Sequence, residues 1–235
     1  MQLHDHHQNI TVLTGAGISK ASGLDTFRED GGAFLKPMTA EELVRDADEH
    51  WRALVESWWP ALRAAEPNPA HRALAAFEDR LAPDQTLTLI TQNVDGLHQK
   101  AGSRNVVEVH GTMARFRCHA CREPIALETI DFASPTPPRH GCGGLPRPDV
   151  VLFGELLDQE ATNRAMAAAL TCDLFVAVGT SSVVFPVASL APIAKERGTR
   201  LVWINPEPPP READIFDEVI LQPAEVGVPA FFGVG

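Results

Sequence analysis

The sequence predicts an α/β fold: a doubly wound, parallel, Rossmann-like sheet of about six strands that carries a small module and a helical insertion. Six short apolar segments alternate mostly with segments whose apolar residues recur at helical spacing. Such alternation is typical of parallel sheets with right-handed crossovers. It stops between residues 112 and 149, where three of the four cysteines lie. We therefore expect a separate, loop-rich module in that stretch.

The first strand is predicted at residues 10–14, a β-branched apolar run of the kind found in buried parallel strands. It ends at a turn formed by Gly15, Ala16 and Gly17. Two glycines let such a turn bend tightly and approach a pyrophosphate, whose charge backbone N–H groups stabilise. An ordinary strand-to-helix turn has the same pattern. Lys20 stands where a dehydrogenase fingerprint has its third glycine, so we expect a dinucleotide site without hydride transfer.

The remaining strands are predicted from apolar runs that end in polar or glycine-containing loops. These runs cover residues 86–91, 106–109, 174–178, 201–204 and 218–221. Helical spacing predicts helices over residues 40–62, 70–81, 158–170 and 186–197. Because ligands of open parallel sheets bind beyond the carboxyl ends of the strands, the loops should meet at one edge.

Polar side chains at two of these strand ends are the candidates for chemistry. Gln92, Asn93 and Asp95 follow the second strand, and His110 follows the third. A capped turn alone would explain the asparagine and the aspartate. A single histidine is more often a packing residue, but one beside a glycine, in register with two other rim loops, is a candidate catalyst.

The cysteine spacing indicates a metal site. Cys118 and Cys121 form a C-x2-C pair, and Cys142 follows about 20 residues later without the second cysteine of a complete repeat. His140 could supply the fourth bond. Three alternatives remain: three thiolates with one imidazole, three thiolates completed by water, and a metal-free remnant. We favour the first, because a small loop-rich module lacks the core to fold without such a link.

Composition narrows the class of protein. The 235 residues carry 20 Lys and Arg against 31 Asp and Glu, a net charge of −11. This charge argues against a nucleic-acid partner and would suit lysine-rich, cationic ones. No apolar run approaches the roughly 20 residues that cross a bilayer, and the N-terminus lacks a secretory pattern. We expect a cytoplasmic, monomeric protein without membrane contact.

Five motifs, in order, resemble those of the sirtuins, a family of NAD-dependent protein deacylases. The first, GAGISKASGLDTFR, resembles the family signature GAGxSxxSGIPxFR, with Asp25 in place of the usual proline. That departure loosens the predicted loop without removing a functional group. The others are TQNVDGLH, the HG pair at His110, RPDVVLFGE and GTS. In the family's second cysteine pair, the first position is occupied here by Arg139 and the last by Cys142.

The resemblance implies a role for each matching residue. NAD would contact Gly15, Ala16, Gly17, Phe27, Arg28, Gln92, Asn93, Asp95, Gly179, Thr180, Ser181, Asn205, Pro206, Glu207 and Ala224. The acylated peptide would pair with an edge strand that includes Val151, Phe153, Gly154 and Glu155. A structural zinc would be held by Cys118, Cys121, His140 and Cys142.

The resemblance also implies a reaction. The acyl-lysine oxygen attacks the ribose carbon of NAD, nicotinamide leaves, His110 acts as general base, and the acyl group departs on ADP-ribose. Asn93 orients a water. The branch that removes succinyl groups carries Y-x-x-R, where this chain has Val55 and Trp58, so we expect neutral acyl groups. The alternatives are a mono-ADP-ribosyltransferase or NAD hydrolase using the same site, and a non-catalytic nucleotide sensor.

The same pattern predicts three parts. Residues 1–30, 70–114 and 148–235 should form the Rossmann-like NAD-binding domain. Residues 31–69 should form a cofactor loop with a helical insertion, and residues 115–147 a small, zinc-ribbon-like, metal-binding module.

Overall fold

A computed structural model describes residues 7–24, 38–181, 184–210 and 215–234. Its main sheet has six strands in the order β3-β2-β1-β7-β8-β9, and each neighbouring pair is parallel. The strands are β1 (Asn9–Thr14), β2 (Thr86–Thr91), β3 (Val106–Glu108), β7 (Leu174–Val178), β8 (Arg200–Ile204) and β9 (Glu218–Ile220). The chain order reverses between β1 and β7. The doubly wound sheet predicted from sequence is confirmed.

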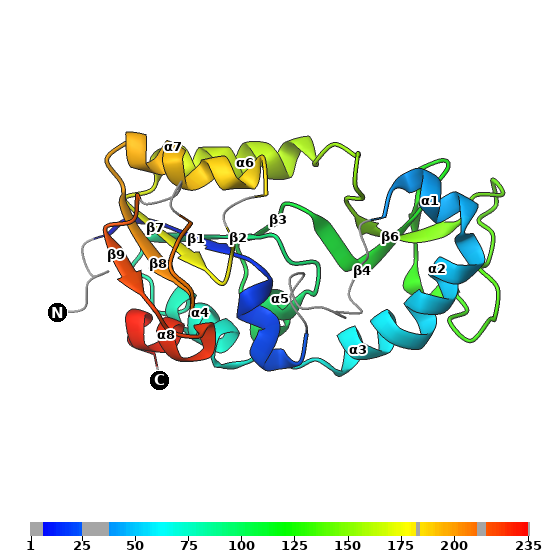
Figure 1. The fold of residues 1–235 in the computed structure, drawn as a ribbon, viewed down its shortest axis with the longest axis horizontal. Helices are drawn as coiled ribbons and strands as arrows, with labels where there is room; N and C mark the ends of the chain where they lie inside the picture. The colour runs from blue at the N-terminus through cyan, green and yellow to red at the C-terminus, as the bar shows by residue number, and fades with distance from the viewer. Residues whose placement is uncertain (1–6, 25–37, 182–183, 211–214, 235) are drawn as a thin grey trace.

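Helices cover both faces of this sheet (Figure 1). On one face lie α4 (Pro69–Glu78) and α8 (Ala224–Phe232), and on the other α6 (Gln159–Thr171) and α7 (Leu190–Glu196). A short α5 (Leu97–Ala101) follows β2, and 3-10 turns span Ala16–Ser22, Leu127–Thr129 and Val187–Ser189. The central strands are apolar throughout because both of their faces are buried, as the five buried residues of β7 illustrate.

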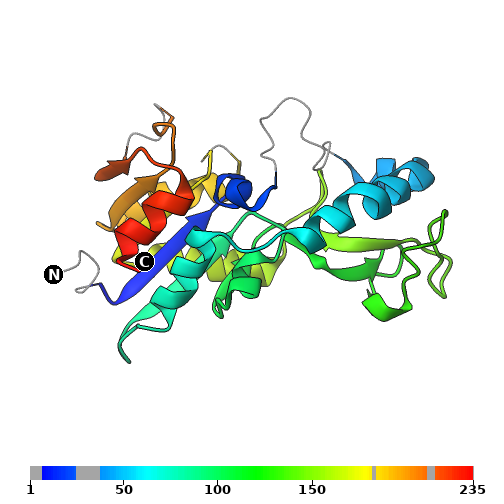
Figure 2. The same ribbon diagram turned by 90° about the horizontal axis from the view of Figure 1, so that it is seen from below.

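A second, smaller group of strands and helices lies beside the main sheet (Figures 1 and 2). Strands β4 (Gly111–Cys118), β5 (Pro124–Ile125) and β6 (Pro146–Val150) form an antiparallel sheet in the order β5-β4-β6. Helices α1 (Ala40–Arg45), α2 (Ala47–Ala53) and α3 (Trp59–Ala64) lie against it. A third apolar cluster joins these helices to the sheet. We call the helices and this sheet together the small lobe.

The helix predicted over residues 40–62 is divided into three. Thr39 caps α1 with a capping box that includes Glu42, and α1 ends at Asp46. Between α2 and α3, Leu54–Trp58 forms a π-helix. Pro60 in the first turn of α3 explains the change, because it has no N–H to donate to the fourth preceding carbonyl and its ring crowds that carbonyl. The apolar spacing therefore predicts which side of these helices is buried, but it does not predict the π-helix.

The RPDVVLFGE segment differs from its prediction as a single edge strand. Its first part is β6, which pairs with β4 in the small sheet. Residues 151–155 continue beyond that strand, and Phe153 makes one isolated bridge to Thr39. The Val151 N–H bonds to the His110 carbonyl, 2.9 Å, just before β4 begins, and the Leu152 N–H then bonds to the Glu155 Oε2, 3.0 Å, so the pairing with β4 ends there. The small sheet spans residues 111–150, across the predicted domain boundaries at 115 and 147.

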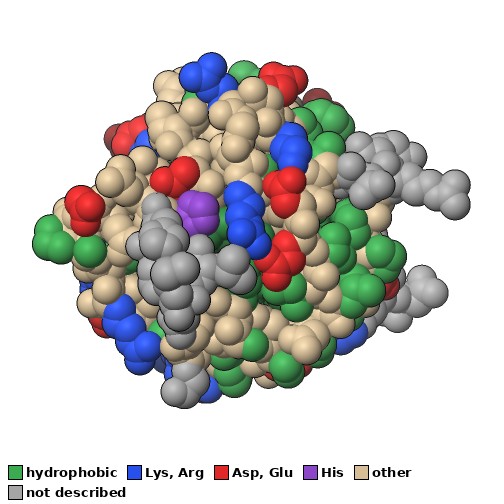
Figure 3. Space-filling model, turned by 90° about the vertical axis from the view of Figure 1, so that its left-hand side faces the viewer, with side chains coloured by type: hydrophobic (Ala, Val, Ile, Leu, Met, Phe, Trp, Pro, Cys, Tyr) green, Lys and Arg blue, Asp and Glu red, His purple; other side chains and the backbone are tan. Residues whose placement is uncertain are grey.

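The surface carries charges of both signs. Lys, Arg, Asp and Glu side chains are interspersed with apolar ones on the end of the molecule opposite the small lobe (Figure 3). Among the described residues, no helix combines the length and apolar character needed to cross a membrane.

Candidate active site and metal centre

Three predicted residues meet beside the turn after β1. The Asn93 Nδ2 donates to the Gly15 carbonyl and to the Ser19 Oγ, 3.1 Å in each case. The Ser19 Oγ donates to the Asp95 Oδ2 at 2.7 Å, and Asp95 also accepts the Leu97 N–H at 2.9 Å. Burial raises the pKa of Asp95, and these hydrogen bonds oppose the change. The loops after β1 and β2 therefore form one polar unit.

The same edge includes the loops after β7 and β8. The Gln92 Nε2 donates to the Thr180 Oγ1 at 2.7 Å, and the Asn205 Nδ2 donates to the Thr180 carbonyl at 2.9 Å. Thr180 is buried, whereas Gln92 and Asn205 are half-buried. Four loops that are distant in sequence are thus joined by hydrogen bonds at the carboxyl ends of their strands, beside the switch point between β1 and β7.

The glycines of the first turn have a role that the sequence did not predict. A Cβ on Gly15 would lie 2.8 Å from the Gly179 carbonyl oxygen and the Thr180 Cα, and one on Gly17 would lie 2.8 Å from the Gly179 Cα. Gly179 itself has φ +56. These glycines therefore allow two loops to pack together. We predicted them from approach to a phosphate, but here backbone contact within the protein requires them.

His110 lies at the junction of the main sheet and the small lobe. Its Nδ1 is 2.9 Å from the Gln92 carbonyl oxygen. Because a carbonyl can only accept, Nδ1 carries the proton of the neutral ring and Nε2 has the free lone pair. Burial lowers the pKa of His110, and the hydrogen bond to Gln92 opposes that change. The half-buried imidazole is therefore a neutral base near pH 7.

Two buried histidines support this rim. His98 closes the TQNVDGLH motif, but the sequence analysis assigned neither His98 nor His71 a role. The His98 Nε2 is 3.0 Å from the Thr14 Oγ1, and the His71 Nε2 is 3.5 Å from the Ser19 Oγ. Their rings meet edge to face with centroids 4.8 Å apart. Burial lowers the pKa of His71 to about 4 and that of His98 well below its usual value.

A sequence signal for His71 existed. Asn68 caps α4, and its backbone N–H is 3.4 Å from the His71 Nδ1, which forms a capping box. The Asn68 Nδ2 also donates to the Ile18 carbonyl at 2.7 Å. An N-x-x-H pattern at a helix start could therefore have been recognised as a link between α4 and the turn after β1. No comparable spacing distinguishes His98.

The residues predicted to bind a peptide come directly after β6. Val151 and Glu155 are half-buried, whereas Phe153 and Gly154 are exposed. The Phe153 N–H donates to the Met38 carbonyl at 3.0 Å. Phe153 and Gly154 are therefore exposed to solvent, while hydrogen bonds hold the backbone of the segment against the protein.

The four predicted metal ligands come together at the far end of the small lobe. One donor atom from each of Cys118, Cys121, His140 and Cys142 lies within 4.8 Å of the other three. The His140 Nδ1 is 3.4 Å from the Cys121 Sγ and 3.3 Å from the Cys142 Sγ, and the Cys118 and Cys142 sulfurs are 3.4 Å apart.

This donor set fits zinc. At Zn–S of about 2.3 Å and Zn–N of about 2.0–2.1 Å, a tetrahedral ion separates its ligands by about 3.5–3.8 Å, close to the distances between these atoms. Arg139 does not take part: its Nη1 donates to the Gly143 carbonyl at 3.3 Å. Of the three alternatives left open by the sequence, the arrangement favours three cysteines with one histidine.

The other predicted residues follow β7 and β8, begin α8 or lie outside the described chain. Ser181 is half-buried, Pro206 and Glu207 are exposed after β8, and Ala224 is buried at the start of α8. The Glu207 carbonyl accepts the Trp203 indole N–H at 2.8 Å. Phe27 and Arg28 lie outside the described residues.

The fold and the rim define a nucleotide-binding α/β protein with a base at the crevice and a metal-binding lobe. The Sir2 family model matches residues 15–186, and the chain belongs to this family. A protein of Thermus thermophilus named NAD-dependent protein deacylase is 45% identical over 213 residues, which cover 86% of this chain and 81% of the relative. One of Ralstonia nicotianae with the same name is 43% identical over 95% of this chain and 90% of its own length.

Solved structures lead to the same family. A Sir2 homologue bound to ADP-ribose aligns with a TM-score of 0.86 and 35% identity, over 97% of this chain and 92% of that one. A Sir2 complex with a p53 peptide and NAD+ aligns with a TM-score of 0.86 and 32% identity, over 98% and 96%. The family expected from the sequence motifs is confirmed.

Proposed function

We propose that this protein is an NAD-dependent protein-lysine deacylase that transfers a neutral acyl group from lysine to ADP-ribose and releases nicotinamide. The observation that carries the proposal is that hydrogen bonds join Asn93 and Asp95 to the turn after β1, while the carbonyl of the adjacent Gln92 holds the imidazole of His110. Relatives at 43–45% identity are named NAD-dependent protein deacylases. A nucleotide sensor would need no base beside its ligand, whereas a transferase does.

NAD fits the rim because half-buried polar side chains surround the switch point of the sheet, where α/β folds bind nucleotides. Gln92, Asn93 and Asp95 would hold the nicotinamide and its ribose. The loops at Gly179–Ser181, Asn205–Glu207 and Ala224 would hold the adenosine half. When bound, NAD supplies the ADP-ribosyl group that accepts the acyl chain.

His110 has the features of the general base. Its Nδ1–H is held by the Gln92 carbonyl, so its Nε2 is oriented and free to take a proton from a ribose hydroxyl. Its lowered pKa keeps the ring neutral at neutral pH. Asn93 is fixed by Gly15 and Ser19, which leaves its Oδ1 to orient a water in the nicotinamide pocket. A water-excluding pocket would favour departure of neutral nicotinamide.

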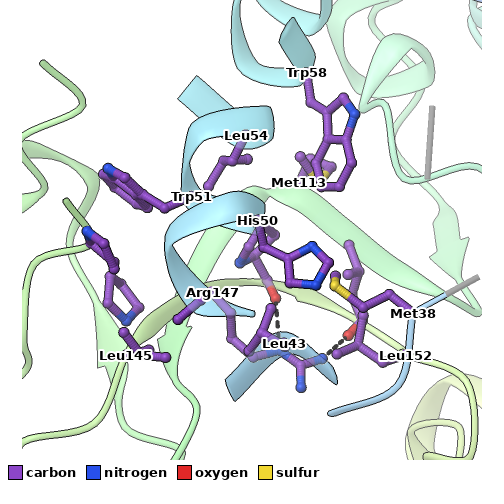
Figure 4. A pocket seen from close by; sticks show the side chains of 15 residues that line it. Met38, Leu43, His50, Trp51, Leu54, Trp58, Met113, Leu145, Arg147 and Leu152 are labelled. Atoms are coloured by element: carbon purple, nitrogen blue, oxygen red, sulfur yellow. Dashed lines mark hydrogen bonds between the residues drawn. The ribbon is translucent and has the colours of Figure 1, made fainter. Parts of the chain in front are cut away.

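The preference for neutral acyl groups follows from Val55 and Trp58, which stand where a succinyl-removing enzyme has tyrosine and arginine, and from the lining of a cavity in the small lobe. A cavity of about 40 Å³ lies between the helices of the small lobe and its sheet (Figure 4). Its mostly apolar lining includes Trp58, Met113 and Leu152. Arg147 also lines it, but both terminal nitrogens of this arginine already donate to Glu155. Among the described residues that line the cavity, the Arg147 guanidinium is thus already paired, and His50, whose Nε2 has no hydrogen-bond partner, is the other group that could meet a carboxylate. A succinyl carboxylate would need a protonated His50 to avoid being buried unpaired, which is costly.

Zinc bound by Cys118, Cys121, His140 and Cys142 would be structural. All four positions of a tetrahedron come from the protein, which leaves none for a substrate. The cluster also lies at the end of the small lobe away from His110. The ion would fix the loop between β4 and β6 and supply no reaction step.

The partners that suit this site are acyl-lysine proteins or peptides, which the exposed segment 151–155 would bind by main-chain hydrogen bonds. The Sir2 complex with a p53 peptide supports this reading. We further propose a cytoplasmic monomer with no nucleic-acid or membrane partner, whose net charge of −11 suits cationic substrates. We also propose the division into three parts predicted from the sequence, with the small module widened to include the whole sheet over residues 111–150.

One assay tests the function. Purified protein, NAD and a panel of acyl-lysine peptides should yield nicotinamide and O-acyl-ADP-ribose in equal amounts, with acetyl turned over faster than succinyl. Nicotinamide without O-acyl-ADP-ribose would identify an NAD hydrolase or an ADP-ribosyltransferase instead. A Val55→Tyr, Trp58→Arg double variant should raise succinyl turnover relative to acetyl by about tenfold, because it supplies a hydroxyl and a charge-assisted partner.

A further inference from the structure

A buried ion pair in the small lobe has no part in the proposed chemistry. The side chain of Arg147 is 2% exposed. Its Nη1 donates to the Glu155 Oε1 at 2.7 Å, and its Nη2 donates to the Glu155 Oε2 at 2.8 Å. The Nη2 also donates to the Val150 carbonyl, and Figure 4 shows Arg147 within the cavity lining. This fork-to-fork contact is the strongest geometry available to the two groups.

Glu155 is held from several sides. Its Oε2 accepts the Leu152 N–H at 3.0 Å and lies 3.7 Å from the Arg117 Nη2. Arg117 is itself paired with Asp149 at 2.9 Å. Burial alone would raise the pKa of Glu155, but the hydrogen bonds from Arg147 and Leu152 outweigh it and lower this pKa to about 2. The carboxylate is therefore ionised and directed into the protein.

Buried ion pairs contribute little net stability, because removing both charges from water offsets their attraction. The Arg147–Glu155 pair instead restrains the backbone between β6 and the end of segment 151–155. It joins the β6 residue Arg147 to the end of segment 151–155, whose other end is held by the Val151 hydrogen bond to His110. Between these ends the Phe153 N–H is also held by the Met38 carbonyl, 3.0 Å, while the Phe153 residue is 60% exposed, so the segment presents its outer side to a partner.

We propose that Arg147 and Glu155 are positioning residues, which hold segment 151–155 in the conformation that an acylated peptide pairs with beside His110. This inference rests on the proposed deacylase function. Glu155 acts through its inward carboxylate, which orients the Leu152 N–H and the turn around it, and its side chain does not contact the peptide. Loss of the carboxylate should weaken peptide binding and leave the NAD edge of the main sheet unchanged.

The variant Glu155→Gln tests this inference with little change of shape. We expect the Kd of a fluorescently labelled acetyl-lysine peptide to rise about tenfold or more, as for loss of a charge-assisted hydrogen bond, and the Kd of NAD to stay within about twofold. The matched control is Glu218→Gln, because Glu218 accepts from the Arg200 Nη2 at 2.7 Å on the main sheet. The control should change neither Kd.

Hydrogen exchange on the free protein provides a second readout that does not depend on activity. The amides of residues 151–155 should exchange faster in Glu155→Gln than in the wild type or in Glu218→Gln. If Glu155→Gln fails to fold, the double variant Arg147→Met, Glu155→Leu leaves neither charge unpaired and should show the same faster exchange.

The outcomes separate the two claims. Unchanged exchange and an unchanged peptide Kd in a folded variant would overturn the positioning role. A wild-type protein that binds NAD but no acetyl-lysine peptide would overturn the proposed function itself, whatever the exchange rates of segment 151–155.

Discussion

The main sheet and the small lobe are held together in different ways. Every residue of β7 is buried, and two apolar clusters cover the two faces of the main sheet. The small lobe has a three-stranded sheet, one apolar cluster, a buried Arg147–Glu155 pair and a four-residue ligand group. Apolar burial alone can support the first region, whereas the second depends on specific polar and metal contacts. A perturbation should therefore affect the two regions separately.

The largest effect should follow loss of the base at the junction of the two regions. His110→Ala should lower kcat/KM by about 10²–10⁴-fold, because general-base catalysis contributes that much. The unfolding temperature should change little, since this imidazole is half-buried. His7→Ala is the matched control, because His7 lies 3.4 Å from Asp173 near the start of β1. Steady-state kinetics on both variants measures the difference, and wild-type turnover by His110→Ala would refute the role of this residue.

Loss of the metal should disrupt the small lobe and spare the main sheet. Cys142→Ser and His140→Ala should reduce bound zinc from about one ion per chain, whereas Arg139→Ala should keep it, because the Arg139 guanidinium donates to the Gly143 carbonyl and is not among the four donors. Elemental analysis measures zinc, and hydrogen exchange locates the loss of structure. Full zinc retention by His140→Ala would exclude the imidazole as the fourth ligand. Equal loss of protection in the main sheet would contradict the comparison of the two regions.

Acid should weaken the main sheet through its two buried histidines. His71 and His98 stay neutral when folded and gain protons when unfolded, so stability falls as pH drops below 6.5. The fall for each histidine approaches about 1.4 kcal/mol per pH unit, and for His71 it ends near its folded pKa of about 4. Urea unfolding at several pH values measures the slope. His71→Gln should reduce it, and an identical slope would show that His71 titrates normally in the folded protein.

A smaller effect concerns the pH dependence of activity. Because burial lowers the pKa of His110 from 6.5, the acidic limb of kcat/KM should have its midpoint below pH 6.5. A pH–rate profile with the acetyl-lysine peptide measures this midpoint. A midpoint above 6.5 would mean that His110 is stabilised in its charged form, contrary to its surroundings.

The sequence predicted the main sheet more fully than the small lobe, for a physical reason. Strands such as β7 have continuous apolar runs because both faces are buried, and their polar ends identify the rim. The π-helix after α2 depends on the absence of an N–H at Pro60, which apolar spacing does not reveal. The buried contact of His98 with Thr14 joins residues 84 positions apart, and no local pattern records such a pairing.

Some site residues were found for reasons that differ from the ones the structure gives. Gly15 and Gly17 were identified as phosphate-binding positions, yet their hydrogen atoms face Gly179 and Thr180. Glu155 was predicted among the peptide-binding residues, and its carboxylate is directed toward Arg147. A motif can therefore identify a residue correctly while leaving its physical task open.

The central claim is that loops distant in the chain enclose one NAD molecule at one edge of the main sheet. Hydrogen exchange with and without NAD tests it most directly. NAD should protect the loops after β1, β2, β7 and β8 simultaneously, with no change around Cys118, Cys121 and Cys142. Protection confined to a single loop, or located in the small lobe away from His110, would contradict it.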